Sequence, residues 1–548
     1  MNKLLENTGR CIALTLVLLL WPFTSSASDT TRPWTFWYWM YGAVSEAGIK
    51  ADLQCMKDVG LGGCYLMPIR SENEYSPLMP PMEFEPARQL SPRFWQMVDY
   101  AMAQADSIGL EMGVHICDGF ALAGGPWIAP EESMQQVTWT DTIVTLSRSA
   151  SVVPLPQAAK GSLSREYNNY YRDIAAFAIP VDGQSTLPQP KVGGTVPPGV
   201  NGTGFAVASK DSYIDLDYGR PVTVRNIEVV PSGNNVQVQR LLVQASTDGQ
   251  NYTDVRQLSP PRQGWQNTDV NYTYSLPTTT ARYFRLRWTP NGTEPGAEDL
   301  DAAKWNHVLK LKAVTLGSQP VVDQYESKNG SVWRIAAPCP PQCVAANAPA
   351  PVAVSLAGCR TETPLPPGTY RILRLGHTST GHKNATAGGG KGLECDKFSV
   401  EAVDKQISQW FGSFMQRPHS SVVKFMHVDS WECGSQNWST NFAAEFKARR
   451  GYDVLPFMAV YAGVPIDAMP QAKRMVLTSE DVLADIRLTI NDLLQEVFFA
   501  TVSRRAQQYG VMLSCESVAP TMVSDGMQHY KYADVPMGEY WLKSPTHD

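Results

Sequence analysis

Three features are missing from this chain of 548 residues, and each absence narrows the functions it can have. No long run of like charge occurs, and with a net charge of −6 there is no basic surface for nucleic acid or an anionic membrane. No Cys-X-X-Cys pair and no His/Cys spacing suited to structural zinc is present. Beyond the N-terminal segment, no apolar run reaches the roughly 18 residues that a membrane-spanning helix needs. We therefore expect a globular protein without a nucleic-acid or membrane partner.

Residues 1–27 have the pattern of a secretory signal peptide. Its positive region, apolar core and small-residue cleavage site are Lys3 with Arg10, Cys11–Phe23 and Ser25–Ala27. We expect this segment to be removed and the rest of the chain to be secreted or periplasmic.

The cysteines fit an exported protein but indicate little else. Of the ten, nine remain once Cys11 is removed with the signal peptide. Cys339, Cys343 and Cys359 lie in a Pro-rich segment, where an oxidising compartment would allow one disulfide. The odd count leaves at least one free thiol.

Strand-like and helical runs alternate in the first and last parts of the chain. Strands are expected at 34–40, 62–68 and 110–117, and helices at 45–59 and 94–108. The alternation resumes after the middle of the chain, with a central strand that begins at Val422. This order favours βα units around a parallel sheet. We expect residues 28–146 and 368–548 to form a (β/α)8 barrel of the TIM type.

The intervening residues, 147–367, are richer in Pro, Gly, Thr and Asn, and short alternating runs replace the helical pattern. Within about 202–317, Ser246–Thr253 followed by Arg282–Arg287 resembles the discoidin-like, galactose-binding-like β-sandwich. The resemblance implies a β-sandwich inserted in the barrel. Such a module either binds sugars or serves only as structural support.

The barrel does not reach its full number of strands. We count about seven of the eight strands that the fold requires, with Arg371–Gly376 and Met458–Ala462 among the candidates. The chain stops at Asp548 before the barrel is complete. We therefore expect a truncated catalytic domain.

Three glutamates follow the expected ends of strands, namely Glu432, Glu516 and Glu539. In a (β/α)8 barrel these ends meet at the catalytic face. Hydrolysis of a glycosidic bond needs two carboxyl groups there, one acid and one base or nucleophile. Neighbouring aromatic residues, such as Trp541, would form an apolar wall that raises the pKa of one of them. The alternative for one or two of the glutamates is a salt bridge with Arg or Lys.

Other polar and aromatic residues near these strand ends are candidates for contact with a sugar. They are Trp39, His115, Asp118, Glu394, Asp396, Asp429, Asn437, Trp438 and Trp541. Some have other interpretations. His115 could be a hydrogen-bonded core histidine, and Asp429 could cap a turn. Glu394 and Asp396 could bind calcium, and Asp396 could cap a helix.

Several motifs together resemble glycoside hydrolase family 106, the α-L-rhamnosidases. They are Trp37–Gly42, Gly48–Leu53, Gly124–Trp127, Gly392–Phe398, Asp429–Trp438 and Pro536–Trp541, and they occur in the family's order from about Arg32 onward. The resemblance implies an inverting exo-α-L-rhamnosidase, assisted by Ca²⁺, that acts on rhamnose-containing plant or bacterial glycans. It also identifies this chain as the N-terminal part of a longer enzyme.

The resemblance also implies roles for individual residues. Glu432 matches the family's Asp-Ser-Tyr-Glu position and would be the general base that activates water. Glu539 or Glu516 would be the acid or a carboxylate that holds the ligand. The family's barrel continues beyond Met-Gly-Glu-Phe-Trp to a further glutamate, which this chain does not reach. Trp431 and Cys433 replace the Tyr and Ala of the common pattern.

Two alternatives to the rhamnosidase hypothesis remain open. The chain could be a hydrolase of the same fold that acts on another sugar. It could also be a catalytically inactive carbohydrate-binding fragment. Hydrolysis of a rhamnoside that depends on Glu432 would distinguish the first hypothesis from both.

Overall fold

The computed structural model describes residues 32–69, 84–119, 122–159, 170–181, 183–184, 186–196, 201–232, 240–263, 270–290, 309–344, 348–384, 389–466, 469–470, 476–517 and 524–538. The predicted signal peptide, residues 1–27, lies outside these ranges, as do the candidate site residues Glu539 and Trp541.

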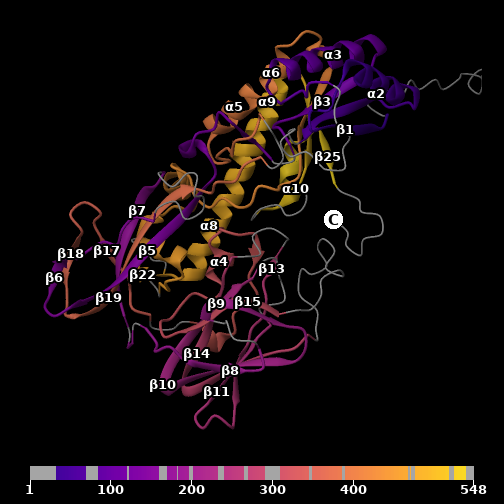
Figure 1. Ribbon diagram of the computed structural model, residues 1–548. Helices are drawn as coiled ribbons and strands as arrows, with labels where there is room; N and C mark the ends of the chain where they lie inside the picture. The colour runs from indigo at the N-terminus through magenta and orange to yellow at the C-terminus, as the bar shows by residue number, and fades with distance from the viewer. Residues whose placement is uncertain are drawn as a thin grey trace, which may run out of the picture.

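A parallel sheet of six strands unites the first and last parts of the described chain. Its strands, in their order across the sheet, are β1 (Trp34–Met40), β2 (Gly63–Ile69), β3 (Glu111–His115), β21 (Val423–Val428), β24 (Met512–Glu516) and β25 (Val535–Met537). Figure 1 shows the indigo strands β1 and β3 in the same sheet as the late strand β25. The predicted parallel sheet is confirmed. Among the described residues it has six strands, and its edge strands β1 and β25 are not paired with each other.

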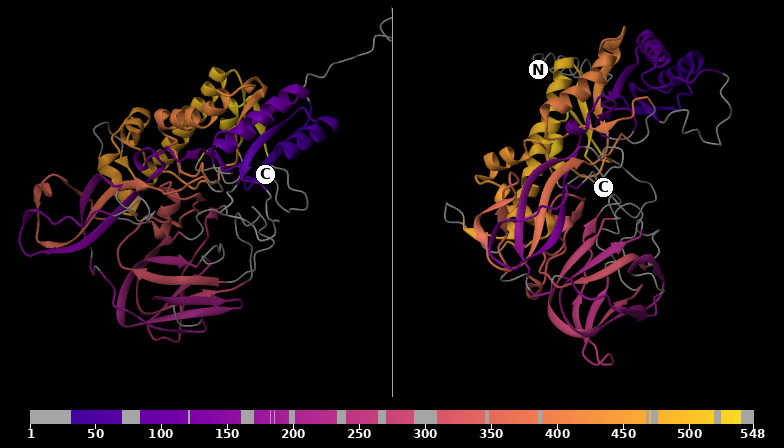
Figure 2. Two further views of the ribbon diagram at one scale, coloured as in Figure 1. Left: turned by 45° about the horizontal axis from the view of Figure 1, so that its top comes forward. Right: turned by 60° about the vertical axis from the view of Figure 1, so that its left-hand side comes forward.

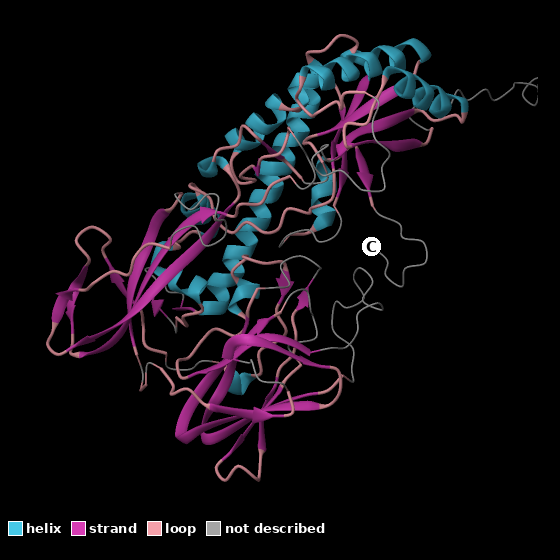
Figure 3. Cartoon of the chain, in the orientation of Figure 1, coloured by secondary structure: helices cyan, strands magenta, loops and turns pink. Residues whose placement is uncertain are grey.

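Helices cover one face of this sheet, as Figure 3 shows in cyan. They include α2 (Glu46–Asp58), α3 (Pro92–Ile108), α5 (Val400–Gln409), α6 (Phe411–Met415) and α9 (Ala500–Tyr509). Local signals set their ends: the Ser45 side chain accepts a hydrogen bond from the Gly48 N–H at the start of α2, and Gly109 ends α3 with φ of 65°. The helices predicted at 45–59 and 94–108 are confirmed.

Side chains alternate along β1 between the two faces of the sheet. Trp37 and Trp39 are buried toward the helices, and the Trp39 ring packs against Phe94 of α3 at a centroid distance of 6.1 Å. Tyr38 and Met40 point to the other face, where 46% and 38% of their surfaces are exposed. One face of the sheet is therefore covered by helices, and the other is open at β1.

The described chain has further helical segments. They are α4 (Tyr325–Lys328), α7 (Phe442–Arg450), α8 (Ser479–Leu493), α10 (Gly526–His529), the π-helical η10 (Leu494–Phe499) and the 3₁₀ segments η3 (Pro130–Glu132), η7 (Pro341–Cys343), η8 (Ser420–Val422), η9 (Leu455–Ala462) and η11 (Tyr530–Tyr532). The strand predicted at Met458–Ala462 is wrong, because this segment belongs to η9. It is fully buried, and a short apolar run in such a place cannot be assigned to helix or strand from periodicity alone.

A separate antiparallel sheet contains the segment predicted as a barrel strand at Arg371–Gly376. Its order is β17 (Val352–Val354), β7 (Arg172–Pro180), β19 (Gly368–Ser379) and β5 (Gln135–Leu146). Strand β19 pairs with β5 from Gly368↔Leu146 to Ser379↔Gln135. The assignment to the barrel was wrong because a strand pattern does not identify the strand's partners.

The third sheet is an antiparallel β-sandwich with a hydrophobic core of its own. Its strands are β8 (Lys191–Gly194), β9 (Asn201–Ala208), β10 (Ser212–Pro231), β11 (Leu242–Ser246), β12 (Thr253–Gln257), β14 (Tyr272–Trp288) and β15 (Leu309–Gly317). Figure 2 shows this sandwich at the far end of the molecule from α2 and α3. The described chain also has short strand pairs: β4 (Gly124–Gly125) with β20 (Leu393–Glu394), β6 (Ala150–Val152) with β18 (Arg360–Leu365), β13 (Arg262–Gln263) with β16 (Arg334–Ile335), and β22 (Met469–Pro470) with β23 (Val476–Leu477).

The cysteines and the helices bear on two further expectations. The predicted disulfide among Cys339, Cys343 and Cys359 is wrong, since all three are free thiols.

No helix in the described ranges is both long and apolar enough to cross a membrane.

A buried ion pair joins the sandwich to the segment that follows it. The Arg256 guanidinium of β12 donates to both carboxylate oxygens of Asp323, at 2.6 and 3.1 Å, and both side chains are almost completely buried. Asp323 also accepts a hydrogen bond from the Ser275 N–H of β14 at 2.9 Å. This pair therefore fixes the exit of the chain from the sandwich toward α4.

We predict that Arg256→Met lowers the free energy of unfolding by ~3–5 kcal/mol, because it leaves the Asp323 carboxylate buried without its cation. Urea denaturation followed by circular dichroism measures the change. The double variant Arg256→Met/Asp323→Leu is the matched control and should recover a large part of the loss. A single variant within ~1 kcal/mol of wild type would contradict a structural role for this pair.

Candidate active site

An imidazole and two carboxylates meet at the C-terminal edge of the parallel sheet. One ligand atom each of His427, Asp429 and Glu516 lies within 4.8 Å of the others, and all three residues are buried. His427 pairs with Ser514 in the register of β21 and β24, so Glu516 follows two residues later on the same face. We name His427, Asp429 and Glu516 the strand-end cluster.

Tyr38 of β1 lies beside this cluster. Burial raises the pKa of Tyr38, and the charges of Asp429 and Glu516 raise it further. The phenol is nevertheless half exposed on the open face of the sheet. A neutral hydroxyl that can donate a hydrogen bond therefore stands next to both carboxylates.

Two neutral histidines hold this part of the site, His427 within the strand-end cluster and His115 beside it. His115 Nε2 accepts the Asp429 N–H at 3.3 Å, and His427 Nδ1 lies 3.0 Å from the Ser514 hydroxyl. Burial lowers the pKa of both rings, that of His427 to about 3. Since an accepting Nε2 carries no proton, His115 holds Asp429 as a neutral ring.

Ser430 connects Asp429 to Glu432. Its N–H donates to Asp429 Oδ1 at 2.8 Å, and its hydroxyl donates to Glu432 Oε1 at 2.9 Å. Glu432 is partly exposed, unlike the carboxylates of the strand-end cluster. It is thus a carboxylate of fixed orientation that a ligand or water can reach.

A buried ion pair lies beneath the loop that follows Glu432. Lys397 Nζ donates to Glu394 Oε2 at 2.8 Å, and neither side chain has any exposed surface. The same Glu394 oxygen accepts the Ala123 N–H at 2.8 Å, and the ammonium lies 5.9 Å from the centre of the Trp431 ring. This arrangement gives Glu394 a structural role and no surface for sugar.

Asp396 anchors the far end of the same loop. Its carboxylate accepts hydrogen bonds from the Phe398 N–H at 2.8 Å, the Ser439 hydroxyl at 2.6 Å and the Gln436 side-chain amide. Burial raises the pKa of Asp396 to about 6. With 3% of its surface exposed, Asp396 positions the loop and does not reach a sugar.

Asn437 and Trp438 connect the loop to the neighbouring antiparallel sheet. Asn437 Oδ1 accepts the Val137 N–H of β5 at 2.9 Å, and its side-chain amide donates to the Asn329 carbonyl at 3.0 Å. Trp438 packs on Phe442 with ring centroids 5.0 Å apart. Both residues are buried, and these contacts connect the loop to β5 and α7.

Asp118 and Trp39 complete the expected residues within the described ranges. Asp118 is buried against the Gly390 backbone, and burial raises the pKa of its carboxyl well above its usual range. Trp39 lies on the helix-covered face, opposite to Tyr38, and is buried there.

Sequence reasoning missed Tyr38 and His427. The signal was available in the period of two along a strand. Residues two apart on a strand share a face, so His427 lies on the same face as Asp429. Successive residues point to opposite faces, so Tyr38 and Trp39 lie on opposite faces of the sheet. Applied to the candidate strands, this rule would have selected both residues.

A hydrogen-bonded histidine supports the segment directly after Glu516. His529 Nδ1 and Nε2 each lie 2.7 Å from a hydroxyl, those of Ser517 and Ser524, and the ring stacks on Phe499 at 4.1 Å. The Ser517 N–H donates to the hydroxyl of Tyr530, which in turn donates to the Met537 carbonyl. The ends of β24 and β25 are therefore held together by side chains.

We predict that wild type loses stability as the pH falls from about 6.5 to about 4, in part because His529 is held neutral. Burial lowers the pKa of His529 to about 4, so in this window the unfolded state binds the proton more strongly than the folded state. His529→Gln should reduce the pH dependence of the unfolding free energy by up to ~1.4 kcal/mol per pH unit. Urea titrations at several pH values measure it. The exposed His419→Gln is the control, and an unchanged slope in His529→Gln would refute the assignment.

Known proteins resemble the chain over nearly all of its length. A solved rhamnosidase from Novosphingobium sp. PP1Y aligns with a TM-score of 0.69 at 23% identity, covering 93% of this chain and 48% of that one. A curated relative from Formosa agariphila, named "Putative beta-glucuronidase", is 24% identical over 531 residues, or 94% of this chain and 32% of its own length. The chain thus spans about half of the solved structure and about a third of the curated relative. A pectin-binding carbohydrate-binding module covers 24% of the chain at a TM-score of 0.19.

The family is shown by a match that takes in both halves of the parallel sheet and the β-sandwich between them. The glycoside hydrolase family 106 model, described as alpha-L-rhamnosidase, matches residues 25–548. The chain therefore belongs to glycoside hydrolase family 106, the α-L-rhamnosidase family.

Proposed function

We propose that this chain carries the catalytic site of an inverting exo-α-L-rhamnosidase that releases rhamnose from plant or bacterial glycans. The observation that carries the proposal is the convergence of Asp429, Glu432 and Glu516 at the C-terminal edge of one parallel sheet. Glycoside hydrolysis requires two carboxyl groups at such a place, and family membership supports rhamnose as the sugar.

In the proposed reaction, Glu432 acts as the general base. Its carboxylate removes a proton from a water molecule, whose oxygen attacks the anomeric carbon from the face opposite the leaving group. The C–O bond to the aglycone breaks, and a carboxylic acid protonates the departing oxygen. Glu516 is the described candidate for this acid, and Glu539 is the other. The Ser430 hydroxyl holds Glu432 in one orientation throughout.

We infer that the open sheet is part of a (β/α)8 barrel. Its six strands are parallel, helices cover one face, and the polar side chains follow the C-terminal ends of β21 and β24. These are the features that place a catalytic site at the top of such a barrel.

A calcium ion fits the strand-end cluster in part. Asp429 would hold it, since calcium prefers carboxylate and hydroxyl oxygens, and Glu516 would be a second ligand only where Glu539 supplies the acid. The His427 nitrogen is a less suitable ligand, so sugar hydroxyls or water would have to complete the coordination. Bound there, the ion would orient the sugar and balance the negative charge of the two carboxylates.

Hydrolysis of another sugar is the second candidate. The name of the curated relative, which refers to a β-glucuronidase, favours testing an aryl β-glucuronide beside an aryl α-L-rhamnoside. The proposal expects turnover of the rhamnoside only.

We also propose that the enzyme is exported by residues 1–27, as the sequence pattern supports.

We predict that Glu432→Gln lowers kcat on an aryl α-L-rhamnoside by ~10²–10⁴-fold, because the amide cannot accept the proton of water. KM should change little, since the side chain keeps its shape. Steady-state kinetics of the chain without its signal peptide measures both. Glu362→Gln, an exposed position in the inserted region, is the matched control. Full activity of Glu432→Gln would reject the assigned base.

We predict that calcium binds the wild-type chain and that Asp429→Asn weakens this binding by ~10-fold or more, because one carboxylate ligand is lost. Isothermal titration calorimetry with calcium chloride reads this binding without reference to activity. A chelator should also lower the rate of rhamnoside hydrolysis. If wild type and Asp429→Asn bind calcium with equal affinity, the calcium site is not the strand-end cluster.

A further inference from the structure

A cavity of about 770 Å³ lies between the segment that follows the β-sandwich and the helical layer, and the proposed catalytic mechanism does not use it. Its charged and aromatic lining residues are Asp323, Lys328, Trp333, Arg334, Glu480 and Arg487. We name it the interdomain cavity. None of these residues belongs to the strand-end cluster, and the volume lies within the range of small-molecule sites.

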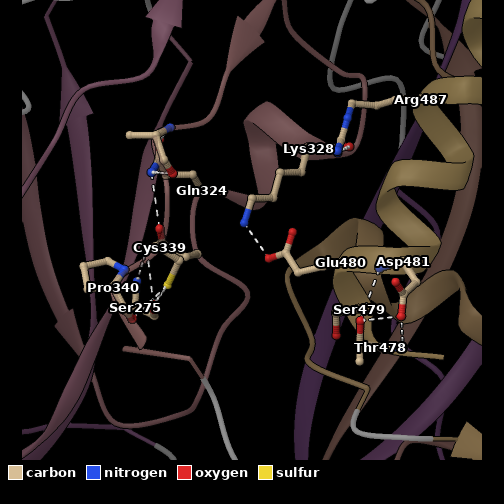
Figure 4. A network of polar contacts seen from close by, with 12 residues as sticks. Ser275, Gln324, Lys328, Cys339, Pro340, Thr478, Ser479, Glu480, Asp481 and Arg487 are labelled. Carbon is tan, nitrogen blue, oxygen red and sulfur yellow. Dashed lines mark hydrogen bonds and ion pairs between the residues drawn. The ribbon is translucent and has the colours of Figure 1, made fainter. Parts of the chain in front are cut away.

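The interdomain cavity is bordered by two stretches that are far apart in the sequence, residues 321–344 and 465–524. Lys328 ends α4, Trp333 precedes β16, and Glu480 and Arg487 lie seven residues apart on α8, so they share a face of that helix. Figure 4 shows Lys328 and Glu480 reaching toward each other, with Arg487 above them. In Figure 1, α4 lies between the helical layer and the sandwich. A ligand here would contact both the segment that follows the sandwich and helix α8.

Three of the charged groups in the interdomain cavity already have an ion-pair partner. Lys328 Nζ lies 2.6 Å from Glu480 Oε1, and Asp323 is paired with Arg256. These contacts leave neither carboxylate available to a further cation.

Arg487 is different. Its guanidinium donates one hydrogen bond, at 2.7 Å, to the Lys328 carbonyl, and no described carboxylate forms an ion pair with it. The side chain is largely buried, and this burial lowers the pKa of Arg487. A guanidinium has five N–H donors, and Arg487, which lines the cavity near the Glu480 charge, uses one of them on the Lys328 carbonyl. Such a group is stabilised by a planar carboxylate that binds through two parallel hydrogen bonds.

Other lining residues of the interdomain cavity are apolar. Trp333 is partly exposed, and its ring makes no stacking contact with another aromatic ring of the described residues. Ile335 and Val344 also line the cavity, although 59% and 60% of their surfaces are exposed. A flat indole beside aliphatic side chains suits the apolar face of a sugar ring.

We propose that the interdomain cavity is a second carbohydrate site that binds an acidic sugar. The carboxylate of a uronic acid accepts two hydrogen bonds from Arg487, and the sugar ring stacks on Trp333. The site would hold a glycan that carries acidic units while the strand-end cluster acts on another part of it. Binding here is independent of catalysis, so it can be measured whether or not rhamnosides are hydrolysed.

The test compares two sugars that differ at one group. Isothermal titration calorimetry of the full chain with methyl β-D-glucuronide should show binding at least ~10-fold tighter than with methyl β-D-glucoside. Arg487→Gln should remove this preference, and Trp333→Ala should weaken binding of both sugars. Arg220→Gln, an exposed arginine of β10, is the matched control and should behave as wild type.

Folding and site identity are checked in the same samples. Thermal melting monitors each variant, and Arg487→Lys, which keeps the charge but loses the planar donor pair, should retain an intermediate preference for the glucuronide. Saturating L-rhamnose should not displace the glucuronide. Absent binding, equal affinity for the two sugars, a preference that survives in Arg487→Gln, or displacement by rhamnose would each overturn the proposal.

Discussion

The ion pair between Glu394 and Lys397 is the interaction on which the candidate active site depends. Both charges are completely buried, which is costly unless each is paired and hydrogen-bonded. The Lys397 ammonium also donates to the Cys395 carbonyl at 2.9 Å. The Lys397 backbone N–H donates to the side-chain oxygen of Gln436, in the loop after Glu432. The loop therefore has one position in which these charges are satisfied. Since Glu432 precedes it, the same contacts orient the proposed base.

Parallel pairing brings together the residues that the chemistry needs. Strands β3, β21 and β24 are adjacent, although β3 is separated from β21 by the whole β-rich region. That region begins and ends at paired residues, Leu146 and Gly368. A large insertion is tolerated there because its two ends already lie side by side. The arrangement leaves a second domain near the catalytic one, with the interdomain cavity between the segment that follows the sandwich and the helical layer.

Much of the parallel sheet could be predicted, because its strands are apolar runs bounded by helices with clear caps. Asp429 and Glu516 were found from their place at strand ends. The roles of Glu394, Asn437 and Trp438 could not be predicted, because burial and partners such as Val137 are set by contacts distant in sequence. The same limit explains the errors at Arg371–Gly376 and Met458–Ala462, whose composition fits both the expected and the observed structure.

The central claim is that the carboxylates at the end of the parallel sheet hydrolyse α-L-rhamnosides with inversion. It is tested most directly by proton NMR of the first sugar that the chain releases from an aryl α-L-rhamnoside. Inversion predicts that β-L-rhamnose is released first and then equilibrates with the α-anomer. Release of the α-anomer first, or no release by a folded sample, would contradict the account.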